Sequence, residues 1–456
     1  MEHRIIGFVI RETYLKKDCG VSCRNSFRID CKEGVTLVQI EELPNGVIIL
    51  TEEIPHVRSA AVGIWVDVGS RDEKPEQNGI SHFIEHALFK GTASRSAKRI
   101  AEELDAVGGQ LNAFTAKEYT CYYAKVLDEH FPLAVDVLTD MLFNSRFDQD
   151  DLEREKNVIL EEIRMYQDTP DELVHDVFTG TIWQGHALGR PVIGTEEVVK
   201  DLSREDLLRF YEDHYLQGRM VVAVAGNVPH ARAVTALEAA FNKVGGEKRA
   251  QTRVRPEAKA EICHCTRDTE QVHLCIGTPG VALGDDVVYV FQVLNTALGG
   301  GMSSRLFQRI REESGLVYSV YSYHSSYHDT GVFCVYAGLA PSNVAQTLDM
   351  VAAEFAAVRN RGITEEELAR AKNQLKGGFL LSLESVTTRM SRMGKSQLYL
   401  GKVLTPEEVV TRIERVTLDD VHGLADAVFR PDRFTFASIG PWEDGAAWKS
   451  ALGRLS

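Results

Sequence analysis

The chain contains an internal repeat, and this repeat constrains the fold more than any other feature of the sequence. Three segments of the first half recur in the second half in the same order, and the members of each pair lie about 214 positions apart. In the first pair, both copies begin with a helix-capping residue, Asp148 or Thr364, followed by acidic residues, as helix N-termini prefer. The three pairs are 147–157 with 363–373, 196–199 with 407–410, and 220–226 with 434–440. We therefore predict two copies of one domain.

The predicted copies span residues 36–245 and 262–456. Between them, residues 246–261 are polar and charged, as is typical of a linker. Residues 1–35 form an N-terminal extension to which the sequence assigns no role.

Local patterns in the first copy predict both kinds of secondary structure. Residues 60–68 are predicted to form a strand, residues 94–107 a helix, and residues 111–126 a strand, a turn and a second strand. Strands and helices occur in blocks rather than in strict alternation. We therefore predict an α+β fold in which each copy is a mostly antiparallel sheet with helices packed on it.

Composition and charge exclude several classes of protein. The 456 residues carry a formal net charge of −15, which argues against a nucleic-acid partner. No apolar run is long enough to span a membrane, and the run at 5–10 is too short for a signal peptide, so we expect a cytoplasmic protein without a membrane partner. The cluster Cys19, Cys23 and Cys31 is interpreted as unpaired thiols, because no fourth metal ligand follows at a matching spacing.

The strongest chemical signal is the segment His82-Phe83-Ile84-Glu85-His86. On a helix, residues i and i+4 share a face, so both imidazoles can reach one metal ion. Glu85 would lie beside a water bound to that metal, and it could act as the base that activates this water. The order H-x-x-E-H is the inverse of the commoner H-E-x-x-H motif. The alternative is a pair of exposed helical histidines that flank a glutamate.

A catalytic zinc usually has a third protein ligand and one open position. Glu162 is the candidate for the third ligand, and Glu155 lies seven residues before it on the same helical face. One of the two carboxylates can bind the metal while the other supports a ligand. The alternative is an acidic, solvated helix.

The second copy argues against that alternative. Ala371 and Gly378 occupy the positions of Glu155 and Glu162. When residues 87–88 are aligned with residues 297–298, both of which read Ala-Leu, Gln292, Asn295 and Thr296 lie opposite His82, Glu85 and His86. All five positions differ together between the copies, which indicates that only the first copy carries a site.

These residues resemble those of the pitrilysin (inverzincin) family of zinc peptidases, in particular the bacterial homologues of the mitochondrial processing peptidase β subunit. The resemblance rests on the segment 79–92, which contains the histidine motif, and on Glu162. It extends over roughly residues 40–440. It implies that His82, His86 and Glu162 bind one zinc ion per chain, that Glu85 is the general base, and that Glu155 supports the ligands. It also implies that the two domains face each other across a cavity.

The resemblance further implies residues that bind the substrate. Asn112, Ala113 and Phe114 match an edge strand to which a substrate peptide adds as an extra strand. Arg311 and Tyr318 match a pair in the second domain that holds the substrate and stabilises the oxyanion. Without the resemblance, Phe114 would be interpreted as a core residue, Arg311 as a surface cation and Tyr318 as a strand residue.

The sequence thus predicts a zinc-dependent metalloendopeptidase that cleaves peptides or unfolded polypeptide segments. By resemblance it would be a homodimer, because one chain holds both the zinc-binding half and the Arg/Tyr half. Two alternatives stay open at this point. The first is a non-catalytic relative that retains the fold. The second is an amidohydrolase-type zinc protein with small substrates, which would have no peptide-binding edge strand.

Overall fold

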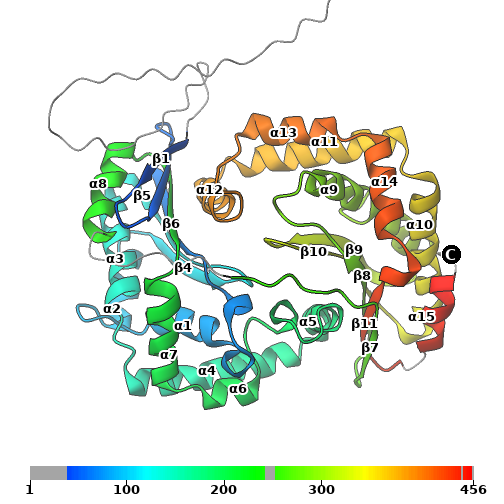
Figure 1. The fold of residues 1–456 in the computed structure, drawn as a ribbon, viewed down its shortest axis with the longest axis horizontal. Helices are drawn as coiled ribbons and strands as arrows, with labels where there is room; N and C mark the ends of the chain where they lie inside the picture. The colour runs from blue at the N-terminus through cyan, green and yellow to red at the C-terminus, as the bar shows by residue number, and fades with distance from the viewer. Residues whose placement is uncertain (1–37, 242–251, 443–444, 454–456) are drawn as a thin grey trace, which may run out of the picture.

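The fold consists of two sheets that lie side by side, each in one half of the chain (Figure 1). The computed structural model describes residues 38–241, 252–442 and 445–453. The predicted N-terminal extension, with its three cysteines, lies outside the described residues, as does the first part of the predicted linker.

The first sheet has six strands in the order β1-β2-β6-β3-β5-β4. Its strands β2 and β6 are parallel, and every other neighbouring pair is antiparallel. The strands are β1 (Val38–Glu42), β2 (Ile48–Glu53), β3 (Ser59–Val66), β4 (Gln110–Thr115), β5 (Thr120–Leu127) and β6 (Met220–Gly226). The predicted strands at 60–68 and 111–126 correspond to β3 and to the hairpin β4–β5.

The second sheet has five strands in the order β7-β11-β8-β10-β9. It repeats the pairing of the first sheet, because β7 and β11 are parallel and the remaining neighbours are antiparallel. The strands are β7 (Ile262–Thr266), β8 (Val272–Pro279), β9 (Val317–Ser326), β10 (Gly331–Leu339) and β11 (Thr435–Gly440). The internal repeat is therefore visible in the topology, and the prediction of an α+β fold with two mostly antiparallel sheets is confirmed.

The helices also follow the repeat. Those of the first half are α1 (Ile80–Leu88), α2 (Ala97–Asp105), α3 (Phe131–Asn144), α4 (Gln149–Gln167), α5 (Pro170–Ile182), α6 (Glu196–Asp201), α7 (Arg204–Phe210) and α8 (His230–Phe241). Those of the second half are α9 (Val287–Leu298), α10 (Val344–Arg361), α11 (Glu365–Ser382), α12 (Val386–Leu400), α13 (Pro406–Arg415), α14 (Leu418–Val428) and α15 (Gly445–Leu452). No described helix is long and apolar enough to cross a bilayer. The predicted helix at 94–107 is α2, which begins later because Ser96 caps its N-terminus.

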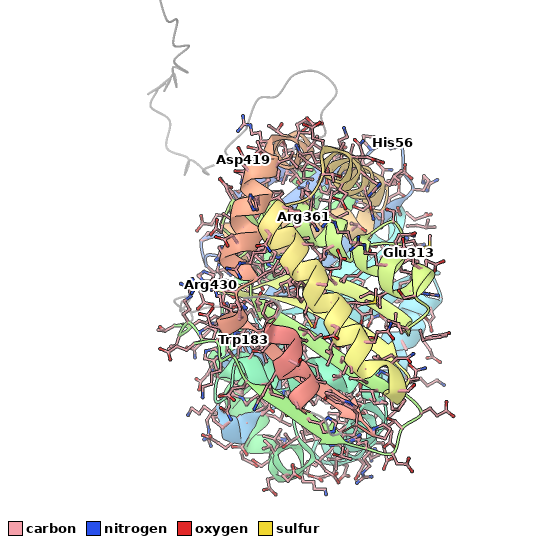
Figure 2. All side chains as sticks on the ribbon, turned by 90° about the vertical axis from the view of Figure 1, so that its right-hand side faces the viewer. His56, Trp183, Glu313, Arg361, Asp419 and Arg430 are labelled. Atoms are coloured by element: carbon pink, nitrogen blue, oxygen red, sulfur yellow. The ribbon has the colours of Figure 1, made fainter. Side chains whose placement is uncertain are left out.

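One face of each sheet is covered by helices of its own half. In the first half, α1, α3 and α8 contribute to a core that also contains alternate residues of β3, such as Val62 and Ile64. In the second half, α10 packs against α14 and α15 on the outer side of the molecule (Figure 2). Phe355 on α10 and Phe436 on β11 belong to the core beneath these helices.

The opposite face of each sheet is covered by a helix of the other half. Helix α12 packs on β3 and β6 of the first sheet, and α5 packs on β8 and β11 of the second sheet (Figure 1). Met390 and Met393 of α12 share a core with Trp65, and Phe178 of α5 shares one with Ile439. The two halves are therefore interlocked, because each lends one helix to the other.

The contact of α12 with the first sheet is close because two glycines make room for it. A Cβ atom at Gly394 would lie 2.3 Å from Nε1 of Trp65, and one at Gly63 would lie 2.4 Å from Sδ of Met390. Trp65 and Met390 are fully buried in this contact. Any larger side chain at Gly394 would therefore separate α12 from the sheet.

An ion-pair network also joins the halves. The guanidinium of Arg71 donates to Glu118 of its own half at 2.5 Å and to Asp329 of the second half at 2.7 Å. Arg71 and Glu118 are buried, so few water molecules compete for these charges. Arg253, in the segment that leads to β7, binds Asp72 at 2.8 Å. The described part of the predicted linker is thus held against the first half by Arg253.

Replacement of Gly394 by alanine is expected to destabilise the protein by about 1–3 kcal/mol, because the added methyl group overlaps the Trp65 ring. Urea unfolding followed by tryptophan fluorescence measures the effect as a lower midpoint. Gly378→Ala is the matched control, because Gly378 lies on α11 with open space around it. The control should raise stability by about 0.5–1 kcal/mol through helix propensity. Equal midpoints for both variants would contradict the close contact.

Candidate metal centre

Helix α1 presents three polar side chains on one face because its other residues belong to the core. The core residues are Ile80, Phe83, Ile84, Ala87 and Leu88, all of them buried. Ser81 is buried as well, and His82, Glu85 and His86 occupy the remaining positions. The sequence motif therefore forms one side of a helix, as its spacing predicts.

The start of α1 is fixed by a buried carboxylate. Glu73 accepts hydrogen bonds from the backbone N–H groups of Gly79 and Ser81, both at 2.9 Å. Burial raises the pKa of Glu73 to about 7. Gly79 has a φ of 97° and lies so close to the Ile193 carbonyl that a Cβ there would be 2.7 Å from its oxygen. A glycine at this position therefore permits the turn that aims α1.

Helix α4 brings two carboxylates to α1. Asp148 caps this helix by accepting hydrogen bonds from the N–H groups of Asp150 and Asp151. Glu155 and Glu162 lie on the face that packs against α1. Glu155 is buried, and Glu162 is half-buried.

The predicted ligands converge. We call His82, His86 and Glu162 the metal set. Oε2 of Glu162 lies 3.7 Å from Nε2 of His86 and 4.0 Å from Nε2 of His82. One ligand atom from each residue lies within 4.8 Å of the other two. In a tetrahedral zinc site, ligand atoms lie about 3.4 Å apart, so a small inward movement would complete the coordination.

The charges of the metal set favour a bound cation. Burial and the neighbouring His86 lower the pKa of His82 to about 3, so its ring is neutral. Nδ1 of His86 lies 2.8 Å from Oε1 of Glu155, and this hydrogen bond leaves Nε2 of a neutral ring as an acceptor. With Nε2 of both rings unprotonated, the metal set offers three acceptor atoms that face one another. A divalent cation satisfies all three, and imidazole and carboxylate are ligands that zinc takes.

Glu155 orients His86 and is itself held by a lysine. Its second oxygen, Oε2, lies 2.6 Å from Nζ of Lys90. Burial alone would raise the pKa of Glu155, but the hydrogen bonds to His86 and Lys90 lower it below its ordinary value. The ionised carboxylate fixes the orientation of the His86 ring toward the metal set.

Glu85 lies between the metal set and the first sheet. Its Oε2 accepts a hydrogen bond of 2.6 Å from Oγ1 of Thr115, the last residue of β4. Burial raises the pKa of Glu85, and the Thr115 hydrogen bond partly counteracts this effect. Glu85 makes no hydrogen bond to the metal set, so it is free to act as a base rather than as a ligand.

The predicted substrate strand lies at the edge of the first sheet. Strand β4 pairs with β5 on one side and is the last strand in the sheet order of the described residues. Asn112 uses its Oδ1 to accept from the N–H of Ala113 at 2.8 Å. Phe114 is half-buried and packs edge-on against Trp65. Phe114 therefore has the packing role that its strand position indicates.

Arg311 and Tyr318 lie in the second half and apart from the metal set. Arg311 stacks over the ring of Phe307 and lies 3.9 Å from Glu312. Tyr318, on β9, is 75% exposed, which leaves its hydroxyl free for a ligand. Among the described residues, no hydrogen bond or ion pair joins either side chain to the metal set.

The second half contains an uncharged counterpart of the site. Asn295 on α9 corresponds to Glu85, and its Oδ1 accepts a hydrogen bond of 2.7 Å from Ser322 on the edge strand β9. The contact between helix and edge strand is thus common to both copies. The carboxylate and the ligands occur only in the first copy.

The sequence did not predict three supporting residues. Thr115 adjoins the predicted substrate strand, Lys90 lies four residues after His86, and Glu73 precedes the motif. Of these three, only Lys90 could have been found from the sequence. It lies four residues after His86, and residues at that spacing share a helical face.

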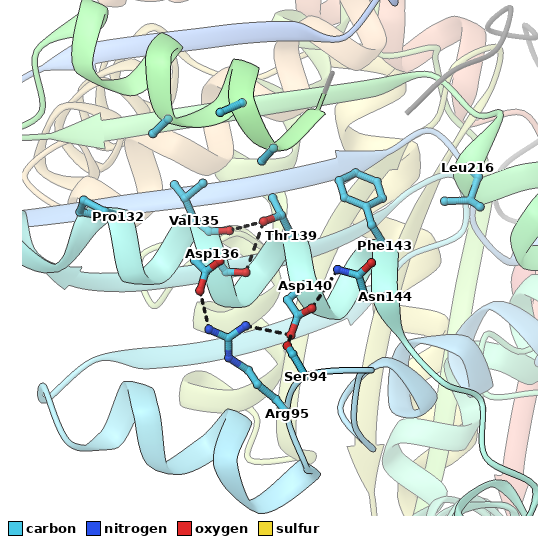
Figure 3. A pocket seen from close by; sticks show the side chains of 13 residues that line it. Ser94, Arg95, Pro132, Val135, Asp136, Thr139, Asp140, Phe143, Asn144 and Leu216 are labelled. Atoms are coloured by element: carbon cyan, nitrogen blue, oxygen red, sulfur yellow. Dashed lines mark hydrogen bonds and ion pairs between the residues drawn. The ribbon is translucent and has the colours of Figure 1, made fainter. Parts of the chain in front are cut away.

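A separate cavity of about 720 Å³ lies between α3 and α8, away from the metal set (Figure 3). Arg95 extends into it and pairs with Asp136 and Asp140. The guanidinium of Arg95 is thus already paired with two carboxylates of α3.

Comparison with known proteins gives family matches over both halves. A family model described as "Insulinase (Peptidase family M16)" matches residues 48–196, which contain the metal set. A model described as "Peptidase M16 inactive domain" matches residues 201–375. The second description agrees with the uncharged counterpart around Asn295.

Two bacterial relatives match nearly the whole chain. A protein of Bacillus subtilis (strain 168), named an uncharacterized zinc protease, is 47% identical over 87% of this chain and 97% of its own length. A Streptomyces coelicolor protein with the same description is also 47% identical, over 93% of this chain and 94% of its own length. The crystal structure of a protease from Helicobacter pylori shares the fold, with a TM-score of 0.83 at 20% identity over 89% of this chain and 100% of that chain.

Replacement of Glu155 by alanine should weaken zinc binding by about 10- to 100-fold, because the His86 ring loses the carboxylate that orients it. Competition with a chromophoric chelator measures the affinity. Glu153→Gln, on the exposed side of the same helix, should leave the affinity unchanged. If both variants retain zinc equally well, Glu155 does not support the ligand.

Proposed function

The chain belongs to the M16, or pitrilysin, family of zinc peptidases, and we propose that it is an endopeptidase that cleaves extended peptides or unfolded polypeptide segments. The observation that carries this proposal is the convergence of His82, His86 and Glu162 beside a separate carboxylate, Glu85. Metal-assisted hydrolysis requires ligands that hold a cation and, beside them, a base that does not itself bind the cation.

Metal binding and proton transfer are assigned to different residues. His82, His86 and Glu162 would hold the zinc ion. When bound, a zinc ion polarises the substrate carbonyl and lowers the pKa of water toward about 7. Glu85 then accepts a proton from the water that attacks the carbonyl carbon. The same carboxyl group returns the proton to the amine as the C–N bond breaks.

Thr115 and burial adapt Glu85 to this role. The hydrogen bond from Thr115 holds the carboxylate in one orientation, and burial makes the carboxylate a stronger proton acceptor than an exposed glutamate. Because Thr115 ends β4, the base and the strand that would bind substrate are coupled directly.

The edge strand supports a peptide as the substrate. An extended chain can pair with the free edge of β4 through main-chain hydrogen bonds, and this places it beside α1, which packs against β4. Asn112, Ala113 and Phe114 form the middle of this edge. A compact protein holds most of its chain packed against the rest of the fold, so it could not extend a segment along β4 and would be excluded.

We assign the second half a part in binding the substrate. The exposed hydroxyl of Tyr318 and the Arg311 guanidinium are donors suited to a carbonyl oxygen that gains negative charge. A cavity of about 480 Å³, lined by Lys117 and Tyr119 from the first half and His324 and Tyr399 from the second, lies between the halves. A peptide bound along β4 would thus be enclosed by both.

Glu85→Gln should retain about one zinc ion per chain and lose about 100- to 10,000-fold in kcat, because the amide cannot accept the proton. His82→Ala should lose both zinc and activity. Elemental analysis and a quenched-fluorescence peptide assay measure the two properties. If Glu85→Gln is purified without metal, or cleaves at the rate of the native chain, its assignment as the base is wrong.

The preference for unfolded chains can be tested with one substrate in two states. A small disulfide-bonded protein should resist cleavage in its native form, and its reduced and alkylated form should be cut at least about 100-fold faster, because a folded chain releases an extended segment only in its rare unfolded fraction. A chelator should abolish cleavage of both forms. Equal rates on the two forms would refute recognition by strand addition.

A further inference from the structure

A second group of metal-binding side chains lies in the core between α5 and the second sheet. His175 comes from α5, Cys275 from β8 and Cys334 from β10. Both cysteines are fully buried, and neither takes part in a disulfide bond. This group is separate from the metal set, because it lies on the sheet of the other half.

The sheet register brings the two thiols together. Cys275 is paired with Tyr336 across the antiparallel strands, and Cys334 lies two residues before Tyr336. Residues two apart in a strand point to the same face, so the two cysteines are diagonal neighbours on the face that α5 covers. Phe178 and Trp183 complete the apolar surroundings on the α5 side.

The distances suit a single ion. Sγ of Cys275 lies 3.4 Å from Nδ1 of His175, and the ligand atoms of all three residues lie within 4.8 Å of one another. Zinc–sulfur and zinc–nitrogen bonds of about 2.3 and 2.0 Å place S and N about 3.5 Å apart in a tetrahedral site. The hydroxyl of Tyr323 lies 2.8 Å from the same Nδ1, which puts a fourth polar atom at the cluster.

We propose that His175, Cys275 and Cys334 form a second metal site, which binds zinc through two thiolates and one imidazole. Thiolate and imidazole are both ligands that zinc takes, and this donor set differs from the two histidines and one carboxylate of the metal set.

Zinc binds a cysteine as its thiolate, so each thiol gives up its proton when the ion binds. An ion at this site would displace both protons, as zinc does at other thiol sites.

The site also has a route to solvent. His175 is half-buried and lines a cavity of about 660 Å³. Asp171 and Glu172, one helical turn before it, line the same cavity and would attract a cation.

Zinc at this site would join the two halves. Helix α5 belongs to the first half of the chain, and both cysteines belong to the second sheet. A bound ion would add a metal cross-link to the apolar contact of α5 with that sheet, so it would stabilise the interlocked pair.

Cobalt(II) distinguishes the two sites, because thiolate ligands give intense charge-transfer absorption in the near ultraviolet and a site of nitrogen and oxygen ligands does not. The full chain is stripped of metal, kept reduced and titrated with cobalt(II). We expect about two ions per chain, with charge-transfer absorption that arises from only one of them.

Two sets of variants assign the absorption. Cys275→Ser and Cys334→Ser should each abolish it and reduce the bound metal by about half, whereas Cys263→Ser, on β7 of the same sheet, should change neither quantity. The double variant His82→Ala/His86→Ala should keep the absorption and lose the other ion. His175→Ala, which leaves both thiols in place, tests the imidazole by a shift of the absorption and weaker binding.

The outcomes separate this inference from the proposed function. A reduced, folded chain that binds one ion, cleaves peptides and shows no thiolate absorption would refute the second site and leave the peptidase intact. A chain that shows thiolate absorption without peptidase activity would support the second site and refute the proposed function. Thiolate absorption that persists in both serine variants would also overturn the assignment.

Discussion

The structure depends on the reciprocal burial of two helices. Each sheet has a face that its own half leaves uncovered, and the other half supplies the helix that buries it: α12 for the first sheet and α5 for the second. Neither half can hide its apolar surface alone, because Trp65 would lose its cover without α12 and Ile439 would lose its cover without α5. The position of the metal set relative to the second half follows from this exchange. The ion pairs between Arg71 and Asp329 add charge complementarity to an interface that apolar contacts already define.

The two copies show which parts of the site belong to the scaffold and which to the chemistry. In both copies a helix after the central strands turns a polar residue toward a hydroxyl on the edge strand: Glu85 with Thr115 in the first, and Asn295 with Ser322 in the second. The geometry of the contact therefore does not depend on charge. Only the first copy adds ligands around it and, behind one of them, the buried carboxylate of Glu155 with its partner Lys90. The chemistry is a local addition to a fold that exists without it.

Much of the fold could be predicted from the sequence, because its signals are periodic or repeated. The internal repeat predicted two like domains, and spacing alone placed His82 and His86 on one face of a helix. Glu162 needed a comparison between the copies as well as the resemblance, because no local pattern links it to a helix 76 positions earlier. The exchange of α5 and α12 could not be predicted, since an amphipathic pattern shows that a helix has an apolar face and not which sheet it covers. For the same reason His175, Cys275 and Cys334 carried no joint signal.

Helix α5 follows α4 after only Asp168 and Thr169, and this short junction links two parts of the structure that serve different ends. Helix α4 carries Glu162, and α5 is packed on the second sheet. Arg267 of the second half also donates to the main-chain carbonyl of Gln167 at the end of α4. The helix that bears the third ligand is therefore joined by two residues to the helix that is buried in the other half. The placement of Glu162 and the docking of the two halves depend on the same stretch of chain.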